Sequence, residues 1–132
     1  MAAGKKNASK KPVVLIVEDD EVLLRALYLI FHHDDYTIAT ASDGQTALDM
    51  TGRLKPDIVL LDLLLPKMNG FDYLKNLRSN TVLKDTPVIV LSNLGDSDNI
   101  AKAKSLGAND YLIKSNTDLT VLNDKVKKLL KI

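Results

Sequence analysis

Residues 57–70 read DIVLLDLLLPKMNG, and this stretch decides the fold that we expect for the whole chain. A run of branched apolar residues, Ile58–Leu61, leads into a single carboxylate, Asp62. Such a run, bounded by turn residues, is typical of a strand buried on both faces of a parallel sheet. Pro66 cannot extend a hydrogen-bonded ladder, so the strand must end between Asp62 and Leu65. We therefore expect Asp62 at the carboxyl end of a central strand, where ligands bind in sheets of this kind.

The segments on either side of this stretch predict four more strands and five helices. Apolar or alternating runs predict strands at residues 13–17, 36–41, 87–91 and 111–113. Apolar residues at helical spacing predict helices over residues 20–33, 44–55, 71–80 and 97–106, and from 117 onward. Asn116 or Thr117 is expected to cap the last helix. Strands that alternate with helices in this way indicate an α/β fold with a parallel sheet.

Composition limits the classes of protein that remain. A chain of 132 residues is long enough for one domain with a core of its own. Because there is no cysteine, disulfides, thiolate catalysis and cysteine-bound metal sites are excluded. No apolar run approaches the roughly 18 residues that a membrane span needs, and the N-terminus lacks the apolar segment of a secretory signal. We therefore expect a cytoplasmic protein that has no membrane partner.

The net charge of +1 hides an asymmetry along the chain. Residues 1–11 contain four lysines and no acid, whereas the remainder holds 14 basic and 17 acidic residues. A basic tail can contact nucleic acid or a membrane surface. Four lysines without aromatic residues or periodicity, however, favour a disordered leader over residues 1–11, ahead of a single domain over residues 12–132.

Polar side chains are predicted at the carboxyl ends of four strands. Glu18 and Asp19 follow the first, Asp62 the central one, Ser92 the fourth, and Lys114 the last. In a parallel sheet these groups converge on one edge. Carboxylate oxygens suit Mg²⁺, a carboxylate can attack phosphorus, and a lysine attracts phosphoryl oxygens. The set therefore predicts Mg²⁺-assisted phosphoryl transfer onto a carboxylate.

Four motifs, each at a strand end, resemble those of the receiver domains of bacterial two-component response regulators, of the stand-alone chemotaxis-regulator type. The motifs are LIVEDD at 15–20, LLDLLLPKMNG at 60–70, VIVLSN at 88–93 and GANDYLIK at 107–114. The resemblance covers residues 12–132. It implies a flavodoxin-like, doubly wound sheet of five parallel strands in the order 2-1-3-4-5, with helices on both faces.

The resemblance also implies a role for each candidate residue. It makes Asp62 the phosphorylated aspartate, Asp19 a direct Mg²⁺ ligand and Glu18 a second acid that acts through water. The backbone carbonyl of Leu64 corresponds to a further metal ligand, and Lys114 to the lysine that binds the phosphoryl group. Two further residues correspond to the switch pair of the family, namely Ser92 and Tyr111. The family commonly has proline after this lysine, often with a cis bond, whereas here Ser115 follows Lys114.

From these roles we expect a signalling switch with at most weak autophosphorylation and autodephosphorylation. The implied partners are a sensor histidine kinase or a histidine phosphotransfer protein and an unknown downstream protein, with no nucleic acid. The chain is expected to be a monomer or a weak phosphorylation-dependent dimer. Tyr28 and Leu29 lie away from the apolar face of the first helix, so they are the candidates for partner docking.

Two other functions compete with this interpretation. A small metal-dependent phosphohydrolase would also use Asp62 covalently, but it would need a second acid nearby, and Leu64 cannot serve. A receiver-like module that binds partners without phosphorylation would not need the five site residues, which are all present. A nucleotide-binding fold is disfavoured because no glycine-rich loop follows the first strand.

Overall fold

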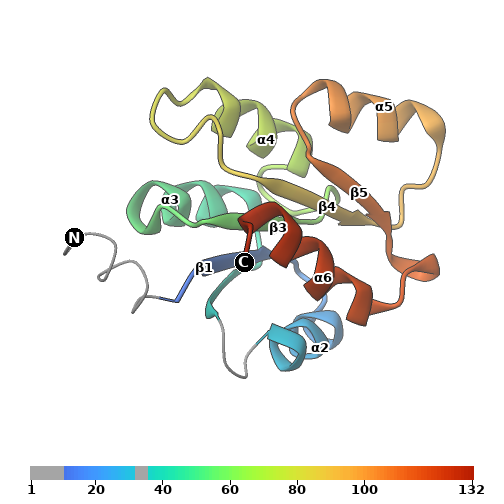
Figure 1. The fold of residues 1–132 in the computed structure, drawn as a ribbon. Helices are drawn as coiled ribbons and strands as arrows, with labels where there is room; N and C mark the ends of the chain where they lie inside the picture. Colours follow the sequence, from blue (N-terminus) through green and yellow to red (C-terminus); the bar gives the residue numbers. More distant parts are fainter. Residues whose placement is uncertain (1–10, 32–35) are drawn as a thin grey trace.

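The computed structural model describes residues 11–31 and 36–132. Five parallel strands form one sheet in the order β2-β1-β3-β4-β5 (Figure 1), which confirms the predicted topology. The strands are β1 Val13–Val17, β2 Thr37–Ala41, β3 Ile58–Leu61, β4 Val88–Ser92 and β5 Asp110–Ile113. The helices are α2 Glu21–Phe31, α3 Gly44–Leu54, α4 Gly70–Ser79, α5 Ser97–Ser105 and α6 Leu119–Leu130, with the 3-10 helix η1 at Lys114–Asn116.

Alternate residues of the central strands supply two hydrophobic cores, one on each face of the sheet. Leu15, Val59 and Leu61 point to the face covered by α3, α4 and α5. Ile16 and Leu60 point to the other face, where α2 and α6 pack side by side (Figure 1). Because both faces are covered, β1, β3 and β4 are almost wholly apolar and buried, as the sequence predicted.

Side-chain caps determine where several helices begin. Asp43, Asn69 and Asp96 each accept a hydrogen bond from the backbone N–H three residues later. The prediction for the last helix was wrong: the cap is Asp118, whose carboxylate accepts from the N–H of Thr120. Residues Lys114–Asn116 form η1, and the Thr117 hydroxyl donates to the carbonyl of Ile113 at 2.8 Å, so neither Asn116 nor Thr117 is placed to cap α6.

Two predicted segments fall partly or wholly outside the described residues. The basic leader is one, apart from Lys11, and the end of the first helix beyond Phe31 is the other. Among the helices that the structure does describe, none is long and apolar enough to span a membrane. The described peptide bonds include no cis bond, and Lys114 and Ser115 both belong to η1.

Candidate functional site

The parallel register brings the ends of four strands to one edge of the sheet. Val17 pairs with Leu61 across β1 and β3, and Leu61 pairs with Val90 across β3 and β4. The residues that follow β1 and β3, together with Ser92 at the end of β4, therefore meet at this edge. Of the residues predicted there, Glu18, Asp62 and Ser92 are buried, whereas Asp19 is exposed.

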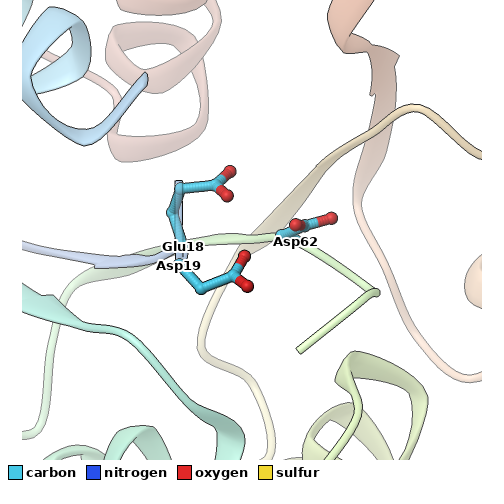
Figure 2. A group of neighbouring side chains, drawn as sticks. All are labelled: Glu18, Asp19 and Asp62. Carbon is cyan, nitrogen blue, oxygen red and sulfur yellow. The ribbon is translucent and has the colours of Figure 1, made fainter. Parts of the chain in front are cut away.

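Three carboxylates converge where β1 and β3 end (Figure 2). Glu18, Asp19 and Asp62 each offer one oxygen, and these three atoms lie within 4.8 Å of one another. The backbone N–H of Leu64 donates to Oδ1 of Asp62 at 3.3 Å, which places the start of the β3–α4 loop beside this carboxylate. Hard oxygen donors with one exposed member suit Mg²⁺, which binds through one or two carboxylates and keeps several waters.

Lys114 connects two of the acids. Its Nζ lies 2.8 Å from Oε1 of Glu18 and 3.1 Å from Oδ2 of Asp62. Although burial acts to lower it, these two hydrogen bonds raise the pKa of Lys114 above its usual value, so the ammonium is charged at neutral pH. One cation then faces two buried carboxylates and the neighbouring carboxylate of Asp19.

The surroundings of Glu18 shift the pKa of its carboxyl. Burial raises the pKa of its carboxyl above the usual value, and this effect outweighs the hydrogen bonds from Lys114 and from the backbone N–H of Asp20. The nearby charge of Asp62 acts in the same direction as burial. A bound divalent cation would reverse this balance, because it favours the charged form of every carboxylate around it.

The two predicted switch residues contact the same segment, the loop after β4. The backbone N–H of Leu94 donates to Oγ of Ser92 at 3.3 Å, and the hydroxyl of Tyr111 donates to the carbonyl of Leu94. Both backbone polar groups of Leu94 are therefore hydrogen-bonded to side chains, one at the end of β4 and one near the start of β5. The sequence did not link Leu94 to this pair, because a sequence motif does not indicate a backbone contact.

Two glycines next to the site were not linked to it from the sequence. Gly44 and Gly70 are the first residues of α3 and α4, and both touch the loop that joins β3 to α4. A glycine at the first position of a helix does not by itself indicate a functional site. The contact that requires glycine here is with the β3–α4 loop, which the sequence pattern does not reveal.

The fold and the site together define a class of protein: a doubly wound α/β domain with an acidic cluster and a lysine at the carboxyl edge of its sheet. The sequence profile of the response regulator receiver domain matches residues 14–127. The chain therefore belongs to the family of response regulator receiver domains of two-component systems. Domains of this family are signalling switches that bind Mg²⁺ at an acidic pocket and interact with histidine kinases or phosphotransfer proteins.

Two curated relatives show the range of proteins that contain such a domain. Sporulation initiation phosphotransferase F of Bacillus subtilis strain 168 is 35% identical over 101 residues, which cover 76% of this chain and 79% of the relative. Regulator of RpoS of Escherichia coli strain K12 is 38% identical over 90 residues, or 68% of this chain. That match spans only 26% of the relative's length.

Solved structures agree with the fold. A response regulator from Chloroflexus aurantiacus J-10-fl superposes with a TM-score of 0.86 at 31% identity, covering 93% of this chain and all of the other. The phosphorylated cyanobacterial phytochrome response regulator RcpA superposes with a TM-score of 0.80 at 27% identity, covering 92% of this chain and 95% of the other.

Proposed function

We propose that this chain is the phosphoryl-accepting switch of a two-component phosphorelay, and that Asp62 receives the phosphoryl group from a sensor histidine kinase or a histidine phosphotransfer protein. The environment of Asp62 carries the proposal. Its carboxylate is 5% exposed at the end of a buried strand, beside two other acids and the ammonium of Lys114. Burying such a charge is costly, which favours a functional reason for it. The phosphorylated state of the cyanobacterial neighbour is consistent with this role.

The proposed reaction needs little beyond positioning. An Oδ atom of Asp62 forms a bond to phosphorus while the P–N bond to the donor histidine breaks. The electron pair returns to the imidazole nitrogen, which takes up a proton. Lys114, already 3.1 Å from Asp62, would bind the transferred phosphoryl oxygens, and the buried hydroxyl of Ser92 would donate to them.

The residues that would hold the metal lie on two segments. Glu18 and Asp19 follow β1, while Asp62 and the backbone carbonyl of Leu64 follow β3. Mg²⁺ bound there would neutralise negative charge on the transferring group. Without a metal ion, the single ammonium of Lys114 is shared by the carboxylates of Glu18 and Asp62, so the site carries more negative than positive charge.

Signalling would then start at the loop after β4. When the Ser92 hydroxyl donates to a phosphoryl oxygen, its contact with the N–H of Leu94 is disturbed. Tyr111, which holds the carbonyl of the same residue, would respond and alter the face that a downstream protein contacts. We further propose that the protein works in the cytoplasm as a monomer or a weak phosphorylation-dependent dimer, without a nucleic-acid or membrane partner.

Tyr28 and Leu29 are proposed to contact the phosphoryl donor. They are 44% and 62% exposed and line an apolar depression of about 360 Å³ between α2 and Thr40 of β2. This helix begins at Glu21, directly after the acids that follow β1, so a protein that delivers a phosphoryl group to Asp62 would lie next to it. Tyr28→Ala should slow transfer from a protein donor and leave phosphorylation by a small donor unchanged. A loss of both would place the defect in the site or the fold.

Intact mass measurement tests the function. The protein is incubated with acetyl phosphate and Mg²⁺, and Asp62→Asn is treated identically. We expect one phosphoryl group on the parent, none on the parent in excess chelator and none on the variant. Equal modification of Asp62→Asn would contradict the proposal. Release of many equivalents of phosphate from simple phosphate esters would instead indicate a phosphohydrolase.

A further inference from the structure

The loop between β3 and α4 is pressed against the first residue of a helix that is remote in sequence. The N–H of Gly44 donates to the carbonyl of Pro66 at 3.3 Å. A Cβ atom built on Gly44 would lie 1.9 Å from the carbonyl oxygen of Met68 and 2.8 Å from its Cβ. Gly44 has an ordinary helical backbone as part of α3, so this contact, and not its backbone conformation, is what requires glycine here.

A second glycine closes the other side of the loop. The N–H of Gly70 donates to the carbonyl of Leu63 at 2.9 Å. A Cβ atom built on Gly70 would lie 2.5 Å from the carbonyl oxygen of Asp62 and 2.7 Å from Cα of Leu63. The nearest neighbours of both glycines are mainly backbone atoms, which cannot rotate away as a flexible side chain can. Residues 62–69 therefore occupy space that Cβ atoms would fill if Gly44 and Gly70 were any other residue.

This loop contains both groups that β3 contributes to the proposed metal site, the carboxylate of Asp62 and the carbonyl of Leu64. Met68 is only four residues beyond Leu64, and Pro66 stiffens the segment between them. If Met68 is pushed away from α3, the displacement must be taken up between Asp62 and Gly70, where the chain is anchored again. Mg²⁺ demands nearly ideal octahedral geometry, so its site tolerates such a displacement poorly.

We propose that Gly44 is a positioning residue for the Mg²⁺ site: by lacking a side chain, it lets the β3–α4 loop lie against α3 and so places the Leu64 carbonyl beside Asp62. This inference rests on the proposed function, because it assumes that Mg²⁺ binds at the acidic cluster. Gly44 itself touches neither the ion nor the phosphoryl group. It acts through the backbone of Pro66 and Met68.

The same helix offers a matched control. Gly52 also lies in α3, is exposed, and a Cβ atom built on it meets nothing within 4 Å. Gly44→Ala and Gly52→Ala therefore introduce the same methyl group into the same helix, and only the first introduces it against the loop. Both gain the higher helix propensity of alanine, so a difference between them reports the contact.

The experiment measures Mg²⁺ and Ca²⁺ affinity from amide chemical shifts in the parent and the two variants. We expect Gly44→Ala to bind Mg²⁺ about tenfold more weakly, as when a group that orients a metal ligand is lost, and Gly52→Ala to bind like the parent. Ca²⁺, which accepts irregular geometry, should lose less than Mg²⁺ does in Gly44→Ala. A purely structural effect would weaken both ions equally.

Parental Mg²⁺ affinity in a folded Gly44→Ala would overturn the inference, and so would equal losses for both ions. A parent that does not bind Mg²⁺ would instead overturn the proposed metal site, so the two failures are distinguishable. If Gly44→Ala does not fold, the double variant with Gly52→Ala repeats the test in a helix strengthened by alanine. In the double variant, too, parental Mg²⁺ affinity or equal losses of Mg²⁺ and Ca²⁺ affinity would overturn the inference.

Discussion

The two ends of the sheet contain polar clusters that differ in their balance of charges and hydrogen-bond partners. At the carboxyl end, the single ammonium of Lys114 faces Glu18 and Asp62, with Asp19 close by. At the amino end, Arg78 of α4 reaches the segments that lead into β4 and β5. Each of its five N–H groups donates to an oxygen, and these belong to Lys84, Thr86, Gly107 (two bonds) and Asn109.

The difference lies in the partners. The five hydrogen bonds of Arg78 all go to neutral oxygens that need a donor, and Asp85 adds a nearby negative charge, so the cluster is complete without a ligand. The acids at the other end exceed the cations beside them, and their mutual repulsion opposes folding until a cation arrives. We therefore expect that removing the side chain of Arg78 destabilises the fold, whereas removing an exposed acid changes binding and leaves stability nearly unchanged.

The largest effect on stability is expected for Arg78→Ala. This change leaves the carbonyls of Thr86 and Gly107 without their side-chain donor and should lower the free energy of unfolding by about 3 kcal/mol. Denaturant unfolding without Mg²⁺ measures it. Arg53→Ala, on the exposed side of α3, is the control and should stay within about 0.5 kcal/mol of the parent. Similar values for the two variants would remove the basis of the comparison.

Tyr73→Phe should have an intermediate effect that depends on pH. Its buried hydroxyl lies 2.7 Å from that of Thr51, which itself donates to the carbonyl of Ala47, so losing it should cost about 1 kcal/mol at neutral pH.

Burial also raises the pKa of Tyr73 to about 12, from 10.0. The unfolded chain thus ionises first as pH rises. The contribution of this group is present in full well below pH 10 and is lost as the pH rises through 10 to above 12, by roughly 3 kcal/mol in all. Denaturant unfolding at several alkaline pH values gives the free energy of unfolding of parent and variant. The two free energies should converge as the pH rises and then cross. Parallel stability profiles would contradict this assignment.

The smallest effect on stability is expected for Asp19→Ala. The side chain is exposed and belongs to the acidic cluster, so without Mg²⁺ the free energy of unfolding should change by less than about 0.5 kcal/mol. Mg²⁺ should stabilise the parent but no longer the variant, because a ligand that binds only the folded state raises its stability. Equal stabilisation of both proteins by Mg²⁺ would rule out Asp19 as a ligand.

Much of this molecule follows from local patterns in its sequence. The unbroken apolar run of β3 followed by Asp62 predicted a central strand and the place of the site, because a strand buried on both faces excludes a lone charge except where it ends. The cap of α6 was missed, since the choice of Asp118 over Thr117 depends on a short 3-10 helix that no periodicity indicates. The contacts of Arg78 and Gly44 were missed for another reason: they join segments that are distant in sequence.

The location of the phosphoryl group tests the central claim most directly. The protein is phosphorylated with acetyl phosphate and Mg²⁺ and then reduced with borohydride, which converts a phosphorylated aspartate to homoserine. Peptide mass mapping shows which residue was converted. We predict conversion at Asp62 and at no other acid, and none when Mg²⁺ is withheld. Conversion at Asp19 or elsewhere in a protein whose Asp62 stays unmodified would contradict the account.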